Sequence, residues 1–498
     1  MLLQEIYDMF DMEAPCERPR KVLQPKKDFR VVLVAPPADF ISELYGFRTR
    51  RSYRNQPPLG IGYIASFLRS HGFSITLLDC AANGWDIETA VRQILSAAPD
   101  VIGITAITFE SAAAFALARQ LKRQSGAFVV LGGAHANSYF PLIPEQCPEL
   151  DAIVAGDGET IMLELCRRLS EARTLEAVPG LRYKQPDGGF SIFVEADPIM
   201  DLDALPPPAY DLYPHHLYRP LPHRAKRLPS GCMITSRGCS YAQCTYCELS
   251  GLIRKTYRRH SPQRVVQEMK MLKEIAGVKE IYFQDDIFIS EQDWVAELCN
   301  RMISARLDLF WSCESRFQGL SKALLERMRQ AGCWRIYYGF ESGSQRLLDK
   351  IKKGFTLEEA RLGVRLAKEA GLDVVGFFML GLPSETPEDG RKTIDFSLSL
   401  GLDHAIYTLT VPHPNTELYA LCQNEGTLLE GNQYYYKTAS FVPLAYQNAA
   451  QLEALRNEAF RRFYYRPAYW WRCLKGINNL VDLKYYVRGF ISLFSYLD

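Results

Sequence analysis

The chain of 498 residues is 47% hydrophobic and 23% charged, a composition typical of globular proteins and long enough for two or three domains that each bury a core. Its formal net charge of +1 gives no reason to expect nucleic acid or an acidic partner. No run of about 18 apolar residues occurs, which excludes a membrane-spanning helix of the usual kind.

Residues 1–28 are polar and interrupted by prolines, and we expect them to form an N-terminal arm. They carry acids and lack a basic start, so we do not expect a signal peptide. The 13 cysteines are an odd number scattered along the chain, which does not suit a disulfide framework. Cysteines that do not form disulfides are expected to stay reduced, and reduced thiols are typical of a cytoplasmic protein.

Residues 29–174 alternate short apolar runs with amphipathic stretches. In the helix expected over 59–70, for example, Ile61, Ile64 and Leu68 recur at helical spacing. Such alternation predicts an α/β fold with a doubly wound parallel sheet, in which ligands bind at the carboxyl ends of the strands. The expected strands lie at 31–37, 75–78, 101–105, 128–131 and 152–155, and further helices lie near 86–97, 111–124 and 160–172.

Two glycine-rich loops follow the fourth and fifth expected strands, namely Gly132-Gly133-Ala-His135 and Gly156-Asp157-Gly158-Glu159. Glycine lets backbone approach a bulky polar ligand closely. The same glycines also suit tight turns from strand to helix. The loops alone therefore leave both interpretations open.

Residues 175–228 are expected to be a connector, because Asp203-Ala-Leu-Pro-Pro-Pro-Ala-Tyr210 contains three consecutive prolines. From 229 to 425 the strand–helix alternation resumes in six rounds. A full barrel has eight such units, so six predict an open, partial (β/α)6 TIM-like barrel with its site at the carboxyl ends of the strands. The strands are expected to end at Ser236, Asp285, Arg316, Phe340, Leu380 and Pro412.

Cys239, Cys244 and Cys247 lie within nine residues, directly after the first strand of this second unit. Three thiolates can hold three irons of a [4Fe-4S] cluster and leave the fourth iron open for chemistry. Zinc is an alternative, but it normally needs a fourth nearby Cys or His, and His260 is thirteen residues further on. Plain core cysteines are the other alternative.

This cysteine loop resembles that of the radical S-adenosylmethionine (SAM) superfamily, in which the open iron chelates SAM. The superfamily has three residues between the first two cysteines, whereas this chain has four. The resemblance gives Tyr246 the position whose backbone meets the adenine. The stretches 339–354, 378–386 and 412–418 are similar to motifs of cobalamin-type members, with Asn415 in place of a glycine. The resemblance thus extends from residue 29 to about 425.

Polar residues follow the next three strands and suit SAM. Its ammonium needs a carboxylate, its carboxylate needs an arginine, and its ribose needs an acceptor. Salt bridges at the rim of the barrel are the alternative for these residues. Together with Tyr246, the expected SAM-binding residues are Gln284, Asp286, Glu314, Arg316, Glu341 and Ser342.

The N-terminal unit looks like the cobalamin-binding domain that precedes many radical SAM domains. Many cobalamin proteins carry an Asp-x-His-x-x-Gly signature whose histidine ligates cobalt. The segment Asp79–Gly84 has Ala81 at that position, so we expect no such ligand. His135 is interpreted as a cofactor contact and not a cobalt ligand, with an incidental turn residue as the alternative. The residues expected to bind cobalamin are Pro37, Thr105, Gly132, Gly133, His135, Gly156, Gly158 and Glu159.

The resemblance implies a cobalamin-dependent radical SAM enzyme that cleaves SAM to a 5′-deoxyadenosyl radical and modifies an unactivated carbon. C-methylation is preferred because it is the commonest outcome among such proteins. Radical oxidative cyclisation or ring rearrangement without methyl transfer, as in the oxidative cyclase of magnesium-protoporphyrin monomethyl ester, is the alternative. A non-catalytic cobalamin-binding regulator is the alternative of another class. The implied cofactors are a [4Fe-4S] cluster, SAM and cobalamin, with an external reductant of the flavodoxin or ferredoxin type.

Residues 426–498 are expected to form a helical C-terminal segment, which from Arg461 onward holds seven Lys or Arg and eleven aromatic residues in 38 positions. Such a segment either packs on the barrel or lies at a membrane surface, with Leu483, Val487 and Phe490 on its apolar face. The second interpretation predicts a large apolar or amphipathic small-molecule substrate and a position at the inner face of the membrane. No basic nucleic-acid domain is recognisable, so no nucleic-acid partner is expected.

Overall fold

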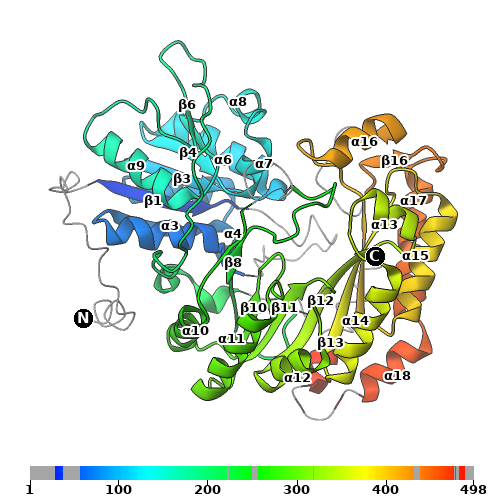
Figure 1. Ribbon diagram of the computed structural model, residues 1–498. Helices are drawn as coiled ribbons and strands as arrows, with labels where there is room; N and C mark the ends of the chain where they lie inside the picture. Colours follow the sequence, from blue (N-terminus) through cyan, green and yellow to red (C-terminus); the bar gives the residue numbers. More distant parts are fainter. Residues whose placement is uncertain are drawn as a thin grey trace.

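The computed structural model describes residues 29–37, 56–218, 220, 224–248, 256–317, 319–429, 438–475, 477, 480 and 482–487. The expected N-terminal arm, residues 1–28, lies outside this part. Two six-stranded sheets, built from residues 30–183 and 230–409, carry the fold. Figure 1 shows the first sheet in blue to cyan and the second in green to yellow. The expected α/β architecture, a doubly wound sheet followed by a partial barrel, is confirmed.

The first sheet has the strand order β2-β1-β3-β4-β5-β6. Its five leading strands are parallel, and β6 pairs antiparallel with β5 at the edge. The sequence did not distinguish this short edge strand as part of the sheet. The strands are β1 (Arg30–Ala35), β2 (Ser74–Asp79), β3 (Val101–Thr105), β4 (Phe128–Gly132), β5 (Ala152–Val154) and β6 (Leu181–Tyr183).

Alternate residues of β1 enter two separate cores, because side chains along a strand point to opposite faces. Val31 and Leu33 join one apolar cluster, and Val32 and Val34 join the other. Helices cover both faces, which is what a doubly wound sheet requires. They are α3 (Leu59–Ser70), α4 (Cys80–Asn83), α5 (Ile87–Ser96), η1 (Thr108–Glu110), α6 (Ser111–Gln124), α7 (Ala134–Tyr139), α8 (Ile143–Gln146) and α9 (Gly158–Ser170).

The second sheet is parallel throughout and has the order β14-β13-β12-β11-β10-β7, so neighbours in space follow one another along the chain. It does not close between β7 and β14, as a six-unit partial barrel predicts. Its strands are β7 (Ser230–Met233), β10 (Glu280–Phe283), β11 (Phe310–Ser315), β12 (Cys333–Glu341), β13 (Asp373–Leu380) and β14 (His404–Leu409). A short ribbon, β8 (Ser236–Arg237) with β9 (Arg258–Arg259), follows β7.

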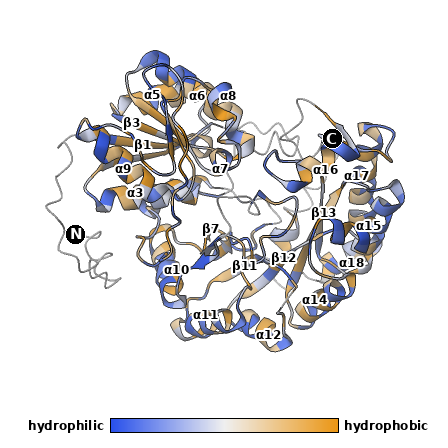
Figure 2. Cartoon of the chain, turned by 45° about the horizontal axis from the view of Figure 1, so that its top comes forward, coloured by the Kyte–Doolittle hydropathy of each residue, from blue (hydrophilic) through white to orange (hydrophobic). Residues whose placement is uncertain are grey.

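Helices of the described part of the chain cover the outside of the partial barrel. Ser261 caps the first of them by accepting a hydrogen bond from the backbone N–H of Arg264, and Pro262 occupies its first turn, as the sequence predicts. Figure 2 shows apolar strands inside and hydrophilic outer faces on these helices. They are α10 (Pro262–Ala276), α11 (Gln292–Ala305), α12 (Lys322–Gln330), α13 (Gln345–Lys350), α14 (Leu357–Glu369) and α15 (Pro387–Ser399).

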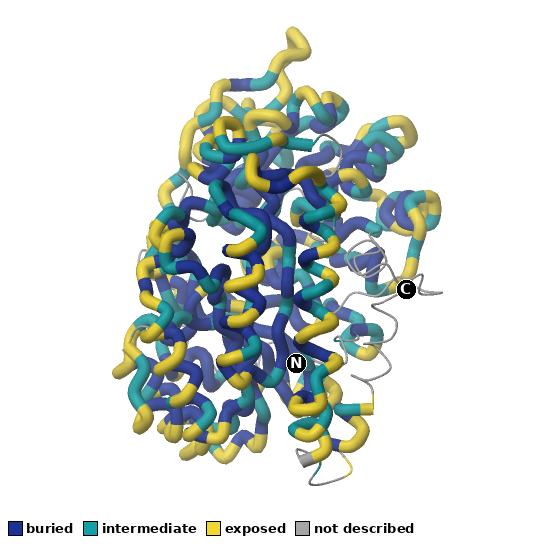
Figure 3. Tube along the Cα trace, turned by 90° about the vertical axis from the view of Figure 1, so that its right-hand side faces the viewer, coloured by how far each residue is buried: buried dark blue, intermediate teal, exposed yellow. Residues whose placement is uncertain are grey.

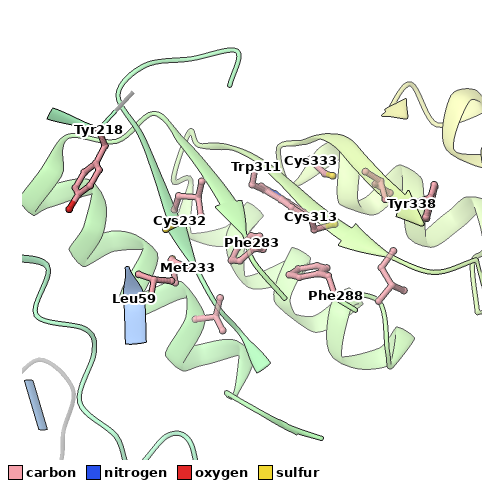
Figure 4. Close-up of a cluster of buried hydrophobic side chains, with 14 of the residues drawn as sticks. Leu59, Tyr218, Cys232, Met233, Phe283, Phe288, Trp311, Cys313, Cys333 and Tyr338 are labelled. Carbon is pink, nitrogen blue, oxygen red and sulfur yellow. The ribbon is translucent and has the colours of Figure 1, made fainter. Parts of the chain in front are cut away.

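The core between the barrel strands and these helices continues into the first unit. The ring of Trp311 packs 5.6 Å from Phe283 and 5.3 Å from Phe288, centroid to centroid. Leu59 of α3 and Met233 of β7 belong to the same cluster, as Figure 4 shows. Of the isolated cysteines in the second unit and the C-terminal segment, Cys299, Cys313, Cys333 and Cys422 are buried, and Cys473 is half-buried.

The connector joins the two units through three tyrosines. Tyr213 donates to the carbonyl of Pro58 at 2.7 Å, Tyr218 to Asp79 at 3.0 Å, and Tyr210 to Glu268 of α10 at 2.8 Å. Two short turns, η2 (Tyr210–Leu212) and η3 (His215–Leu217), hold them in place. Between Tyr210 and Tyr218 the connector is therefore bonded to both units.

The C-terminal segment is helical, as expected, and packs on the barrel. It follows α16 (Glu417–Glu425) and contains β15 (Gly426–Leu428), β16 (Phe441–Pro443), α17 (Ala449–Tyr464) and α18 (Pro467–Lys475). Beyond α18, Tyr485 accepts from the Arg335 guanidinium at 2.7 Å and Asp482 pairs with Lys226 at 2.7 Å.

These contacts place Tyr485 at the amino ends of the barrel strands, which form the buried interior seen in Figure 3. Phe490 and the apolar positions after it lie outside the described residues. In the part of the chain described here, no helix combines the length and the apolar character needed to cross a membrane.

Candidate functional site

A cavity of about 590 Å³ lies between the carboxyl ends of the two sheets. This volume is within the range of roughly 300–1,000 Å³ that small-molecule sites occupy. Strands of both units reach it: Thr105 ends β3, Gly132 ends β4, and Gln284 follows β10. Gly238, directly before Cys239, also lines it. The cavity therefore joins the glycine loops to the cysteine loop.

The structure brings some of the expected site residues into this cavity and leaves others outside. Pro37 and His135, expected as cobalamin contacts, do not line it. Those that line it are Thr105, Gly132, Gly133, Gly156, Gly158, Glu159, Gln284 and Asp286.

The glycines of the first loop differ in what they allow. A Cβ atom on Gly133, which has a φ of +94°, would lie 2.5 Å from the Thr105 hydroxyl and 2.8 Å from the Ala106 carbonyl oxygen. Glycine is thus required there by a close turn. At Gly132 a Cβ atom would meet nothing closer than 3.8 Å. Gly132 therefore leaves open space at the cavity, whereas Gly133 serves the backbone.

His135 lies on helix α7 and not on a loop, because the helix begins directly after Gly133. Its ring is fully buried, stacks 4.6 Å from the Tyr139 ring, and meets the edge of Phe115. Neither ring nitrogen has a hydrogen-bond partner. Burial, with a smaller effect of His413, lowers the pKa of His135 to about 4. The structure thus packs this histidine against Tyr139 and Phe115, outside the lining of the cavity, and its contact with a cofactor stays a prediction.

An ion-pair cluster across the two units holds the second glycine loop. Arg237 of β8 pairs with Glu159 at 2.5 Å and with Asp157 at 3.1 Å, and Arg258 of β9 also pairs with Asp157. Burial raises the pKa of Asp157, but the two guanidinium groups outweigh it and the pKa lies below its usual value. The carboxylate of Glu159 is therefore committed to Arg237, two residues before Cys239.

The cysteine loop leaves β8 and carries three free thiols, of which Cys244 is buried and Cys239 and Cys247 are half-buried. No group of three or more Cys, His, Asp or Glu side chains among the described residues is arranged to hold a metal ion. The fit of a cluster to the loop rests on its donor set. Three thiols on one loop, with the Arg316 guanidinium 4.0 Å from the Cys244 sulfur, suit an iron–sulfur cluster.

The zinc alternative loses its nearest fourth ligand. His260 is buried, its Nδ1 lies 3.0 Å from Asp203, and its Nε2 lies 3.4 Å from the Tyr63 hydroxyl. Both ring nitrogens are therefore engaged away from the cysteine loop. A three-thiol site without a fourth protein ligand is the pattern expected of a cluster with one open iron.

Two expected SAM-binding residues meet in a buried polar triad. The hydroxyl of Tyr246 donates to Glu341 at 3.0 Å, and the ammonium of Lys353 lies 2.7 Å from both that carboxylate and the Tyr246 hydroxyl. Glu341 has a φ of +63°, at a bulge where β12 and β13 shift register. Burial, with the Glu341 charge, raises the pKa of Tyr246. Tyr246 therefore remains a neutral donor.

The other expected SAM-binding residues are spread over the rim of the barrel. Arg316, directly after β11, packs against the cysteine loop, with its guanidinium 3.6 Å from the Tyr241 ring centroid. Glu314 accepts from Tyr282, and Gln284 bonds to Gln56 of the first unit. Ser342 is buried and accepts from the Ser344 backbone at 3.1 Å, so it supports the turn after β12. Their roles toward SAM remain predictions.

Sequence reasoning missed Arg237, Lys353 and Arg224 as residues of the site. Arg224 lines the cavity with its guanidinium 5.7 Å from the Tyr282 ring. Lys353 stands in the stretch 339–354 that resembles cobalamin-type radical SAM proteins, which was an available signal. Arg237 and Arg224 carry no such signal, because their partners come from distant parts of the chain.

Known families match the chain in the order of its two sheets. The B12 binding domain matches residues 48–166, and the Radical SAM superfamily matches residues 233–397. An uncharacterized methyltransferase of Pyrococcus horikoshii is 33% identical over 444 residues, which cover 89% of this chain and 94% of the relative. An anaerobic magnesium-protoporphyrin IX monomethyl ester cyclase of Rubrivivax gelatinosus is 26% identical over 425 residues, covering 83% of this chain and 75% of the relative.

Solved structures share the arrangement of both units. The radical SAM methyltransferase TsrM from Kitasatospora setae, with cobalamin and a [4Fe-4S] cluster bound, has a TM-score of 0.69 at 18% identity, covering 94% of this chain and 98% of that chain. The cobalamin-dependent enzyme OxsB, with aqua-cobalamin and SAM bound, has a TM-score of 0.70 at 17% identity, covering 94% and 71%. At these identities the likeness concerns the fold.

Proposed function

The chain belongs to the family of radical SAM proteins that carry a B12-binding domain, and from this premise we propose that it is an enzyme that methylates a carbon atom of a small-molecule substrate. The observation that carries methyl transfer is the 33% identity, over 94% of its length, to the methyltransferase of Pyrococcus horikoshii. The cavity shared by the glycine loops and the cysteine loop supports it, because a transferred group would have to pass between the two units.

The proposal assigns cofactors to residues of this chain. Cys239, Cys244 and Cys247 would hold a [4Fe-4S] cluster, the loops at Gly132 and Gly156 would border cobalamin, and SAM would lie beside the cysteine loop. When bound, these groups supply the radical chemistry and the methyl group. An external one-electron donor of the flavodoxin or ferredoxin type is needed to reduce them.

The side chains of the chain orient the reactants and exclude water. The Arg237–Glu159 pair fixes the strand that leads to Cys239, and the Lys353–Glu341–Tyr246 triad fixes the far end of the same loop. Arg316 places a positive charge next to Cys244. Rigid walls of this kind hold reacting groups in place at little cost during the reaction.

Labelled SAM tests the reaction directly. Protein reconstituted anaerobically with iron, sulfide and cobalamin, and supplied with methyl-labelled SAM and a reductant, should form 5′-deoxyadenosine and transfer the label to the product. The triple variant Cys239→Ala, Cys244→Ala, Cys247→Ala should do neither. The substrate candidates come from the neighbouring genes.

Radical oxidative cyclisation is the second candidate, and the relative from Rubrivivax gelatinosus favours it. A changed product that carries no label, with 5′-deoxyadenosine still formed, would replace methyl transfer by cyclisation. Unchanged iron and sulfide content in the triple-alanine variant would overturn the cluster assignment itself. SAM cleavage that is absent in the complete mixture would favour a non-catalytic cobalamin-binding protein.

The proposal includes a large apolar or amphipathic substrate met at a membrane surface. The C-terminal segment exposes Trp471, Leu474 and Leu480, whose relative exposures are 61%, 62% and 73%, and Lys484 lies close to them in the sequence. Exposed aromatic and aliphatic side chains beside basic residues favour the lipid headgroup region. Such a contact is peripheral and reversible.

Vesicle flotation tests this contact. Intact protein should float with anionic vesicles at low salt, and Trp471→Ser, Leu474→Ser and Leu480→Ser together should reduce the bound fraction several-fold. The matched control replaces Ile192, Val194 and Met200, exposed apolar residues elsewhere, by serine. Intact protein that stays unbound would remove the membrane from the proposal, and equal losses in both triple variants would show non-specific adhesion.

A further inference from the structure

The cysteine loop has one more residue between its first two cysteines than the superfamily spacing, and its backbone takes an unusual conformation there. Ala242 adopts a left-handed conformation with a φ of +44°, and its backbone N–H donates to the Cys239 sulfur at 3.3 Å. Residues other than glycine rarely adopt this conformation, so surrounding contacts must hold it. The contacts come from a turn that lies far away in the sequence.

That turn is Ile351–Gly354, directly after α13. The Thr245 backbone N–H donates to the Ile351 carbonyl at 3.1 Å, and the Tyr241 hydroxyl donates to the Lys352 carbonyl at 2.9 Å. Two successive carbonyls of the turn are therefore satisfied by the cysteine loop, one on each side of Ala242 and Cys244.

The third residue of the turn extends this docking to the other end of the loop. Arg316, stacked on Tyr241, donates to the Lys353 carbonyl. The Lys353 ammonium reaches the Tyr246 hydroxyl, directly before Cys247. A side chain and two carbonyls of one short turn thus contact the loop from Tyr241 to Tyr246, and Arg316 links the third carbonyl to Tyr241.

Gly354 shows how closely the two segments approach. Its φ is +71°, and a Cβ atom there would lie 2.0 Å from the Tyr241 hydroxyl oxygen and 2.6 Å from the adjacent ring carbon. A methyl group at this position would have to displace Tyr241. Gly401 has nearly the same φ, +70°, but has open space around its Cβ position. The two glycines share nearly the same φ and differ in the contact with the cysteine loop.

We infer that the turn Ile351–Gly354 is a template that fixes the shape of the longer cysteine loop, with Lys353 as a positioning residue, so that four residues between Cys239 and Cys244 are required in this protein. The inference rests on the proposed cluster. It assigns a cause to the longer spacing: the extra residue lets Tyr241 and Thr245 reach neighbouring carbonyls of the turn at the same time.

The first test compares Gly354→Ala with Gly401→Ala, two positions with nearly the same positive φ. After anaerobic reconstitution, Gly354→Ala should contain several-fold less iron and sulfide per chain than wild type, and Gly401→Ala should contain the wild-type amount. Thermal unfolding of both apo-proteins checks that they are folded. Equal cluster content in the two variants would overturn the template while leaving the proposed function intact.

The second test changes the loop. Gln243 is exposed, and deleting it restores the superfamily spacing, yet this deletion should lower the cluster content several-fold, whereas Gln243→Ala should not. A shortened loop with full cluster content would overturn the inference. Wild-type protein that binds no iron would overturn both the inference and the proposed function.

The role of Lys353 is tested by spectroscopy. Lys353→Met should weaken the change that SAM causes in the electron paramagnetic resonance spectrum of the reduced cluster, and Lys353→Arg should restore part of it. Lys352→Met is the matched control, because Lys352 pairs with Glu417 at the surface. An unchanged SAM effect in Lys353→Met would limit Lys353 to packing and would remove it from the inference.

Discussion

At the scale of single residues, His135 is a histidine whose position in the sequence favoured a ligand contact but whose side chain does not line the cavity. It follows two glycines at the end of a strand, which favoured a ligand contact, but the chain turns into α7 and buries the ring against Tyr139 and Phe115. An apolar side chain at position 135 would pack in the same place. The burial has a consequence for the dependence of stability on pH.

The folded protein keeps His135 neutral, because burial lowers its pKa to about 4 while an unfolded histidine has a pKa of about 6.5. The unfolded state therefore binds the extra proton between these values, and stability falls as the pH decreases from 6.5 to 4, by about 3 kcal/mol from this residue. His135→Leu should lose this component. Urea unfolding at pH 7 and at pH 4.5 measures it, and parallel pH profiles for the two proteins would contradict the prediction.

A site residue can be predicted from the sequence when the residues that act with it lie close to it along the chain. Cys239, Cys244 and Cys247 are adjacent in the sequence and were recognisable by spacing. Glu159 was expected to face a cofactor, but its partner Arg237 is 78 positions away, in another unit. Spacing cannot reveal such a pair, because it depends on how two domains dock.

At the scale of elements, α9 and β8 are joined by the buried ion pair between Glu159 and Arg237, whose strength depends on both charges. Burial lowers the pKa of Arg237, but Glu159 and Asp157 outweigh it and raise the pKa above its usual value. Removing one charge would leave its partner buried and uncompensated. Breaking a buried pair in this way costs about 3–5 kcal/mol.

Arg237→Met should therefore lower the free energy of unfolding by several kcal/mol, and adding Glu159→Gln should recover part of the loss. Arg462→Met is the control, because Arg462 pairs with Asp395 at the surface, where a pair contributes about 1 kcal/mol or less. Chemical denaturation of the apo-proteins checks this. A loss no larger than that of the control would show that water reaches the Glu159 carboxylate.

Element prediction succeeded where a helix was long and its apolar face regular. The bounds expected for α3 and α6 agree with the structure, since each presents several turns with one buried face. Helices α7 and α8 were missed because six and four residues are too few to display a period. The edge strand β6 was missed as a sheet member because it has three residues and pairs antiparallel with β5.

At the scale of the whole molecule, the cavity between the two units carries a prediction about cobalamin. Among the described residues, no histidine lines this cavity, and Ala81 stands where many cobalamin proteins have their cobalt ligand. Cobalamin bound here should therefore lack a nitrogen ligand from the protein. The Co(II) state should show no nitrogen triplet in its electron paramagnetic resonance spectrum, and a clear triplet would contradict this placement.

The hydrogen bond between Tyr485 and Arg335, at the amino ends of the barrel strands, sets an order of events during synthesis. Tyr485 meets Arg335, which is made 150 residues earlier and is fully buried in the finished protein. The ribosome has therefore produced the cysteine loop and the barrel strands β7 to β14 before this hydrogen bond can form. Until then Arg335 lacks its bond to Tyr485, and closing so long a loop is a late step. A protease that cut after α18 would sever Tyr485 from the chain that carries Arg335.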